Sequence, residues 1–435
     1  MVALYIAEQG SWDAQITARM PGGNDEPVAD IQPHATSTTP ASSTPAKVVD
    51  TGTPTQLPTL ELANTTVKHT DGTNQKFRVP EGLCVKVAAE GVGKARFMAW
   101  SPDQRLFVPD MVDYLLSPGA KLYALENFDP ETGRFATSTV FLSDLLGVND
   151  VAFYRDADGQ DWIYVAETAY LRRWPYQAGD QKPSGPAEVI AYFPGKQSPG
   201  ETSVVWHITR TLEFVGDQLY VSVGSGCNSC EELAGERAHI EVMDADGSNR
   251  RVYATGLRNA VGLEWANDTL YATANGADHL GINTPDEALF AITEGTHYAW
   301  PYCYLEAGEW LPDSTSVWQR EFDCSTAPAP ITTFPPRSAP LGFTYFDATW
   351  HPAVAQSFLV ALHGSFEAAL GRGYQIVRVT EAGERDVFMD GFQLPGKTRV
   401  ARPVDILPYD EQSFFFSDDH GGRIYFVQAP TDVRD

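Results

Sequence analysis

Two short segments place imidazole, guanidinium and amide side chains where the backbone is exposed. In residues 206–212, His207 could act as a general base, although a single histidine is often structural. In residues 255–263, Arg258 and Asn259 follow a glycine. This combination could serve a binding or catalytic site, but the arginine could equally bind a neighbouring carbonyl or carboxylate group.

Two further segments carry charges of opposite sign. In residues 274–281, Gly276 permits a turn that directs carbonyl oxygens inward, and Asp278 adds an anionic oxygen, a combination that suits Ca²⁺. An ordinary turn held by the aspartate side chain is the alternative. Near the C-terminus, a short span contains three cations, at Lys397, Arg399 and Arg402. These cations could bind a small polyanion or form a solvated loop.

The five cysteines are spaced as two local pairs and one remaining residue. Cys227 and Cys230 form a C-x-x-C sequence, which could be half of a zinc site, a redox couple or a small disulfide. The disulfide is favoured, because no histidine follows the second cysteine as in a c-type haem site. Cys303 and Cys324 could form a second disulfide, and Cys84 is expected to be a buried thiol. Two disulfides would indicate an oxidising compartment, so we expect a periplasmic or extracellular protein.

Composition excludes several classes of function. The chain has 435 residues, with 31 Lys and Arg against 57 Asp and Glu, which gives a net charge of −26. Such a charge repels phosphate backbones, so nucleic acid is not an expected partner. No apolar run approaches the roughly 18 to 20 residues that cross a bilayer, so we do not expect an integral membrane protein.

The elements that must position these residues are strands. Six times the sequence gives an apolar strand, a polar turn and a second strand rich in aromatic or β-branched residues, within residues 96–108, 150–165, 211–223, 261–272, 341–361 and 404–417. The pattern predicts an all-β fold, a six-bladed β-propeller with long inter-strand loops, with a pair of all-β domains as the alternative. Propeller loops surround a central channel, and we expect the chemistry there.

The N-terminal part reads differently. Residues 34–57 are a Ser/Thr/Pro/Ala-rich tract with little to bury, so we expect residues 1–76 to be an extension and linker, with structure beginning near Phe77. Residues 1–7 lack the basic segment and long apolar run of a secretory signal. The catalytic propeller is expected to span residues 77–430.

Taken together, nine motifs in order resemble the soluble sugar dehydrogenases that depend on pyrroloquinoline quinone (PQQ), particularly the L-sorbosone and pyranose dehydrogenase branch. The resemblance covers residues 77–428. The motifs are HxxR at 207–210, GLRNAVGL at 256–263, NGADHLG at 275–281, HYAWPYCY at 297–304, SAPLG at 338–342, HGS at 363–365, GYQIVRV at 373–379, RPVDI at 402–406 and SDDHGGRIY at 417–425.

The resemblance implies a role for each candidate residue. It implies that His207 removes the proton of a sugar hydroxyl while hydride passes to C5 of the quinone. Arg258 and Asn259 would contact the quinone oxygens, and the carbonyls of Gly276 and Ala277 would hold Ca²⁺, with Asp278 as a further candidate ligand. The remaining cofactor contacts would be Arg402, Lys397, Arg399 and His363.

The implied function is the PQQ-dependent oxidation of an aldose or aldosulose. Because no C-x-x-C-H sequence for a fused cytochrome occurs, electrons would leave to an external cytochrome or quinone. The sequence departs from the branch at Arg337 and Phe366, where a histidine and a tryptophan are common, so the sugar stays open. One alternative is a Ca²⁺-dependent propeller lactonase or related hydrolase. Another is a binding propeller without chemistry.

Overall fold

The computed structural model describes residues 60–114, 118–193, 206–232, 235–315, 318 and 321–429. Strands make up nearly all of the regular structure in these residues, and the helical segments among them are two short 3-10 helices, η1 (Cys324–Thr326) and η2 (Ala368–Leu370). The predicted all-β class is therefore confirmed.

The first three blades are four-stranded antiparallel sheets whose strands follow sequence order. Blade 1 contains β4 (Ala99–Trp100), β5 (Leu106–Asp110), β6 (Pro118–Asp129) and β7 (Arg134–Leu146). Blade 2 contains β8 (Asp150–Arg155), β9 (Asp161–Ala166), β10 (Tyr170–Tyr176) and β11 (Glu188–Tyr192). Blade 3 contains β12 (Leu212–Val215), β13 (Gln218–Val223), β14 (His239–Asp244) and β15 (Arg251–Thr255).

The last three blades repeat this plan, and the sixth closes the ring. Blade 4 contains β16 (Ala260–Ala266), β17 (Thr269–Ala274), β18 (Glu287–Ile292) and β21 (Thr332–Phe334). Blade 5 contains β22 (Pro340–Phe346), β23 (Ser357–Leu362), β24 (Gln375–Thr380) and β25 (Arg385–Met389). Blade 6 contains β26 (Pro403–Asp410), β27 (Ser413–Asp418), β28 (Arg423–Gln428) and, from the start of the described chain, β3 (Cys84–Glu90).

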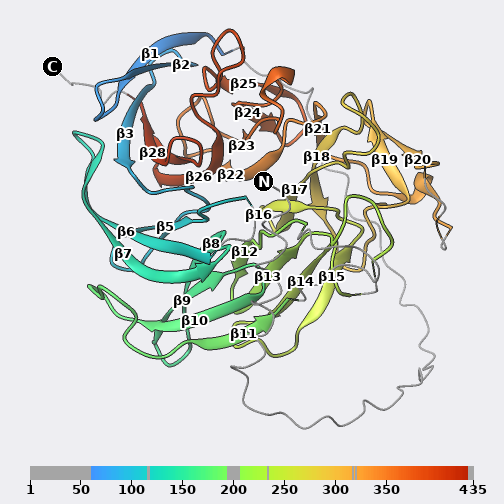
Figure 1. Ribbon diagram of the computed structural model, residues 1–435, viewed down its shortest axis with the longest axis horizontal. Coiled ribbons are helices and arrows are strands. Elements are labelled where there is room, and N and C mark those ends of the chain that lie inside the picture. The colour runs from blue at the N-terminus through green and yellow to red at the C-terminus, as the bar shows by residue number, and fades with distance from the viewer. Residues whose placement is uncertain are drawn as a thin grey trace, which may run out of the picture. The chain divides into compact units, whose positions relative to one another are not determined.

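The six sheets follow one another around a common centre (Figure 1), which confirms the predicted six-bladed propeller. The first strands of neighbouring blades lie beside one another, as β16 and β22 do. Strands in the middle of a blade are covered on both faces by the next sheets, so β23 is buried at every position. This burial explains why such segments read as continuous apolar runs.

A hairpin outside the blades begins before the expected start of structure. It consists of β1 (Leu62–Lys68) and β2 (Asn74–Pro80). Phe77 of β2 is fully buried and packs on the rings of Phe392 and Tyr425. The expectation that structure begins near Phe77 is therefore wrong. β1 has few buried positions, so its apolar pattern is weak.

Four first strands carry a carboxyl group that binds the next blade, and we name these groups the axial carboxylates. Each accepts a hydrogen bond from a backbone N–H of the following blade or of the residue preceding it. The pairs are Asp150 with Leu212 (2.8 Å), Glu213 with Trp265 (3.0 Å), Glu264 with Tyr345 (3.4 Å) and Asp405 with Met98 (2.9 Å). Burial raises the pKa of each of these four carboxyl groups.

Propeller topology gathers half of the loops at one end. In a blade of antiparallel strands in sequence order, the connection between the second and third strands and the connection to the next blade lie at the same end. We call this end the site face. Blade 4 also carries an insertion, the hairpin of β19 (Cys303–Glu306) and β20 (Glu309–Pro312) followed by η1.

Both expected disulfides are present. Cys227 is joined to Cys230, and Cys303 is joined to Cys324 within the blade 4 insertion. Cys84 is free but half-buried rather than buried, because the strand alternation of β3 turns it to the partly accessible side of the sheet. The described residues contain no helix that is long and apolar enough to span a membrane.

Candidate functional site

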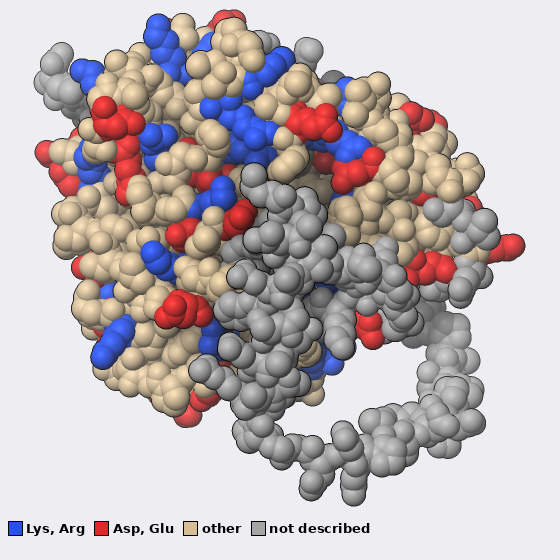
Figure 2. Space-filling view, viewed as in Figure 1, with Lys and Arg blue, Asp and Glu red and all other residues tan. Residues whose placement is uncertain are grey.

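All the predicted site residues lie in connections of the site face. His207 precedes β12, Arg258 and Asn259 precede β16, and the segment from Gly276 to Asp278 joins β17 to β18. His363 joins β23 to β24, and residues 397–402 join β25 to β26. The propeller therefore brings residues from blades 2 to 6 to one end. Figure 2 shows Lys and Arg side chains gathered near β24 and β25, although the net charge of the chain is −26.

His207 is held in one tautomer. Its Nδ1 lies 2.9 Å from the carbonyl oxygen of Ser225 and 2.9 Å from the hydroxyl oxygen of the same residue. Because a carbonyl oxygen only accepts hydrogen bonds, Nδ1 carries the proton and Nε2 presents a lone pair. Within the described residues, Nε2 has no hydrogen-bond partner. The backbone of His207 is left-handed, with φ of 48°, a strained conformation for this residue type.

The surroundings of His207 keep its imidazole neutral. Burial lowers its pKa well below the usual value, and the nearby positive charges of Arg258, Arg237 and Arg210 lower it further, against the opposing effect of the Ser225 bond. A neutral imidazole with a free Nε2 can accept a proton from a substrate.

Gly224 brings His207 and Asn259 together. A Cβ atom at this glycine would lie 2.5 Å from the Cβ of His207 and 2.6 Å from the Oδ1 of Asn259, so a side chain does not fit. Asn259 donates from Nδ2 to the Oδ1 of Asn275 at 3.1 Å. Its own Oδ1 is buried and has no hydrogen-bond partner among the described residues. This acceptor is therefore available to a ligand.

Arg258 is a buried guanidinium held mainly by Asn228. Its Nε donates to the carbonyl oxygen of Asn228 at 2.9 Å, and its Nη2 donates to the Oδ1 of Asn228 at 2.8 Å. Burial lowers its pKa to about 9, with Glu287 opposing the shift and Arg337 adding to it. The side chain therefore stays charged at neutral pH.

The segment from Gly276 to Asp278 offers backbone oxygens more readily than a carboxylate. Within the described residues, no hydrogen bond engages the carbonyl oxygens of Gly276 and Ala277. The carboxylate of Asp278 pairs with Arg337 and lies 3.5 Å from Nη2 of Arg258. A cation bound to this carboxylate would have to displace two guanidinium groups. Gly276 and Ala277 also line a pocket whose other walls are largely apolar and aromatic side chains.

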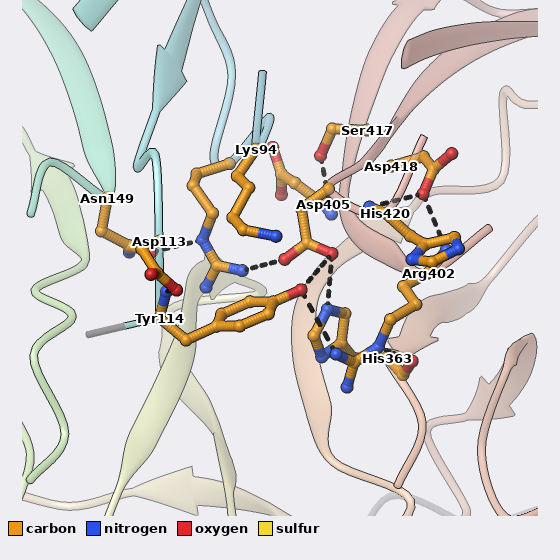
Figure 3. Close-up of polar contacts among 12 residues, drawn as sticks. Lys94, Asp113, Tyr114, Asn149, His363, Arg402, Asp405, Ser417, Asp418 and His420 are labelled. Atoms are coloured by element: carbon orange, nitrogen blue, oxygen red, sulfur yellow. Dashed lines mark hydrogen bonds and ion pairs between the residues drawn. The ribbon is translucent and has the colours of Figure 1, made fainter. Parts of the chain in front are cut away.

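His363 belongs to a buried network of charged and polar groups that also includes Asp419, Arg96 and Arg402 (Figure 3). Its Nε2 lies 2.8 Å from Oδ1 of Asp419, and Arg96 donates to Oδ2 of the same carboxylate at 2.9 Å. Burial and the charge of Arg402 lower the pKa of His363 to about 4, although Asp419 opposes this shift. Burial alone would raise the pKa of Asp419, but His363, Arg96 and Arg402 hold it well below its usual range.

The three predicted cations are held to different degrees. Arg402 is buried and donates to the carbonyl oxygens of His363 (3.2 Å) and Gly364 (2.7 Å). Arg399 is half-buried and donates from Nε to the hydroxyl of Tyr374 at 3.0 Å. Lys397 is exposed. The structure thus joins Arg402 to the His363 network, while Arg399 and Lys397 lie outside this network.

Comparison with known proteins identifies the family. The family model described as TrAA12-like matches residues 77–430. The chain belongs to the TrAA12-like family. This match confirms the resemblance inferred from the sequence motifs.

Solved structures share the propeller of this TrAA12-like chain. The holo form of the pyranose dehydrogenase PQQ domain from Coprinopsis cinerea is 19% identical with a TM-score of 0.64, covering 81% of this chain and 97% of that one. A calcium structure of a family AA12 enzyme from Trichoderma reesei is 18% identical with a TM-score of 0.66, covering 81% and 96%. A PQQ-bound aldose sugar dehydrogenase from Streptomyces coelicolor is 20% identical with a TM-score of 0.54, covering 80% and 99%.

A curated relative from Borreliella burgdorferi, described as an uncharacterized protein, is 28% identical over 226 residues. The aligned region is 50% of this chain and 58% of that relative.

Sequence reasoning about this TrAA12-like chain missed residues that organise the site. Ser225 and Asn228 hold His207 and Arg258. The available signal was the C-x-x-C sequence, which contains Asn228 and begins two residues after Ser225. Asp419 lies in the SDDHGGRIY motif. Arg96 is separated from it by most of the chain, so no local pattern indicates this ion pair.

Hydrogen bonds connect the two histidine regions around the centre. Arg96 donates to Oδ1 of Asn149 at 3.0 Å, and Asn149 donates to the carbonyl oxygen of Arg210 at 3.0 Å. Arg210 in turn donates to the carbonyl oxygen of His207 at 2.9 Å. The positions of His207 and of the His363 network are therefore linked through one continuous chain of buried contacts.

Proposed function

We propose that this chain is a PQQ-dependent dehydrogenase that oxidises an aldose or aldosulose, with His207 as the general base. The observation that carries the proposal is a neutral imidazole whose Nδ1 is bound to Ser225 and whose Nε2 is free, next to the buried guanidinium of Arg258. Membership of the TrAA12-like family supports it, as do the PQQ-bound structures of similar fold.

The residues of the site fit such a cofactor and its metal. PQQ supplies a quinone that accepts hydride, and Ca²⁺ beside it acts as a Lewis acid. The uncommitted carbonyl oxygens of Gly276 and Ala277 would hold the calcium ion, with Asp278 reserved for its arginine partners. Arg258 and Asn259 would contact the quinone oxygens. The carboxylates of PQQ would be matched by Arg402, Arg399, Lys397 and the region of His363.

The residues of the chain divide the remaining work. His207 accepts the proton of the sugar hydroxyl at Nε2, and its lowered pKa keeps that nitrogen unprotonated at neutral pH. The fixed positive charge of Arg258 stabilises negative charge that develops on the acceptor side during hydride transfer. Because both groups are fixed before substrate arrives, little reorganisation is needed during the reaction.

The disulfides and the proposed redox reaction also bear on where the protein works and what accepts its electrons. The two disulfides support a protein of an oxidising compartment, periplasmic or extracellular. The electrons taken from the sugar would pass to an external cytochrome or quinone, which acts as the partner.

The hydrolase alternative receives no comparable support. Among the described residues, one group of at least three His, Cys, Asp or Glu side chains is close enough to hold a metal ion, namely Cys227, Cys230 and Glu232. Its two cysteines form a disulfide, so they do not bind a metal. The axial carboxylates each accept a hydrogen bond from the next blade instead of converging on an ion.

One experiment tests the proposal. The purified chain is freed of metal, supplied with PQQ and Ca²⁺ separately and together, and assayed for dye reduction with a panel of aldoses and aldosuloses. We expect dye reduction when both are present. Hydrolysis of lactones without PQQ, together with no dye reduction for any sugar, would overturn the proposal.

A further inference from the structure

We propose that residues 224–230, which end in the Cys227–Cys230 disulfide and are here named the disulfide loop, are the positioning element of the candidate catalytic pair: Ser225 sets the tautomer of His207, and Asn228 aims Arg258. This inference rests on the proposed function, which supplies the roles of the two positioned residues. The disulfide loop joins β13 to β14 on the site face.

Ser225 presents two acceptors to one ring nitrogen. It is completely buried, and its hydroxyl donates its single hydrogen to the carbonyl oxygen of Cys227 at 2.6 Å. The hydroxyl oxygen can therefore only accept from Nδ1 of His207, as the carbonyl oxygen of Ser225 also does. A His207 tautomer without a proton on Nδ1 would place its lone pair against two acceptors. Ser225 thus keeps Nε2 as the basic nitrogen.

Ser225 also fixes the backbone beside the second catalytic candidate. Its N–H donates to the carbonyl oxygen of Arg258 at 2.7 Å. Arg237 donates to the carbonyl oxygen of Gly224 at 2.8 Å and to that of Trp206 at 2.7 Å. Arg237 therefore ties the connection that carries His207 to the start of the disulfide loop, and Ser225 ties the same loop to the connection that carries Arg258.

Asn228 performs the corresponding task for Arg258. Its carbonyl oxygen and its Oδ1 receive two different N–H groups of the guanidinium, so the plane of the guanidinium is fixed. The same Oδ1 accepts from the backbone N–H of Asp278 at 2.9 Å. One side chain therefore aligns Arg258 with the segment that contains the carbonyls of Gly276 and Ala277.

Cys227 of the disulfide lies between these two positioning residues in the sequence. It is 2% exposed and packs with Ala238 and Trp300, and its bond to Cys230 closes the turn that contains Asn228. Cys227 also provides the carbonyl oxygen that orients the Ser225 hydroxyl. Loss of this covalent bond would release both contacts at once. The second disulfide closes the blade 4 insertion and offers a matched control.

The tautomer is tested without cofactor, on the full chain labelled with ¹⁵N in its histidine rings. His207→Gln identifies the His207 signal by its loss. In the wild type we expect the signal of an Nδ1–H tautomer. In the double variant Cys227→Ser with Cys230→Ser we expect a shift toward the Nε2–H form, and in Cys303→Ser with Cys324→Ser we expect no change. An unchanged His207 signal in the first double variant would overturn the role of the disulfide loop.

The aiming of Arg258 is tested by kinetics of the loaded protein. We expect Asn228→Ala to lower kcat by about 10- to 100-fold with a smaller change in KM, because a small misplacement of a fixed group costs this much. Asn228→Asp keeps the side-chain acceptor and should recover most of the loss. An Asn228→Ala variant as active as the control double variant, or Asn228→Asp as impaired as Asn228→Ala, would overturn the proposal.

These measurements separate the two proposals. Wild type that fails to reduce dye with every sugar contradicts the proposed function, while the tautomer result still decides the role of Ser225 and the disulfide. If the double variant at Cys227 and Cys230 does not fold, the pair of Asn228 variants decides, since both keep the disulfide.

Discussion

His207, which is half-buried, and His363, which is buried, both lie on the site face, yet their rings are bound in opposite ways. His207 uses Nδ1 for a carbonyl oxygen and a hydroxyl oxygen and leaves Nε2 free among the described residues. His363 uses Nε2 for the carboxylate of Asp419. Burial lowers the pKa of both rings, so burial does not distinguish them. The free lone pair does, and it is the ground on which we propose His207, rather than His363, as the proton acceptor.

The charged groups around the two rings also differ. Around His207, the guanidiniums of Arg258 and Arg237 make their shortest hydrogen bonds to backbone and amide oxygens, and their positive charge lowers the pKa of the ring. Around His363, the carboxylate of Asp419 compensates the charges of Arg96 and Arg402. One region is therefore suited to chemistry, and the other to holding Arg402 in place.

The largest expected effect comes from removing the free lone pair. We expect His207→Ala to lower kcat by about 10²- to 10⁴-fold while PQQ remains bound, because general-base catalysis is lost. Turnover is measured by dye reduction, and bound PQQ by its absorbance. His363→Ala is the comparison, and its turnover per bound cofactor should fall much less. Equal losses in the two variants would remove the distinction drawn between the rings.

The next effect concerns stability in the His363 region. Asp419→Asn leaves Arg96 buried without its carboxylate, so we expect the free energy of unfolding to fall by about 3 kcal/mol. Denaturant unfolding measures the change. The exposed Asp347, changed to Asn, serves as the control and should alter stability by less than about 0.5 kcal/mol. A result for Asp419→Asn no larger than for the control would mean that the network is not needed for folding.

The smallest effect is a pH shift in the His207 region. Because its pKa is lowered, kcat/KM should stay level as the pH falls from 7 to 6.5 and decline only in more acidic solution. Arg258→Gln removes a positive charge that disfavours imidazolium, so the decline should move to higher pH by about one unit. The pH profile of kcat/KM is the measurement. A wild-type decline centred at or above pH 6.5 would contradict the lowered pKa.

Part of this site could be predicted from local sequence and part could not. The six strand pairs, both disulfides and the segments that carry His207 and Arg258 are visible as short patterns. The partners of the Asp419 carboxylate are not visible in this way. His363 lies 56 residues before Asp419 and Arg96 lies 323 residues before it, so no local pattern joins the three. Likewise, nothing local shows that Arg337 holds the carboxylate of Asp278, which was expected to face a metal ion.

The axial carboxylates make the stability of the folded protein depend on pH. Burial raises the pKa of Glu213 and Asp405 to about 7, above the values that these groups have in an unfolded chain. Their stabilising contribution is complete below the unfolded pKa of about 4 and is lost as the pH rises to and through the folded value, because the unfolded state gives up its protons first while the folded state still holds them. The histidines with lowered pKa oppose this loss up to about pH 7, because the unfolded imidazole, with a pKa near 6.5, is largely uncharged only above that pH. Above about pH 7 the carboxyl groups dominate, so the melting temperature is expected to fall in a scan from pH 7 to pH 8.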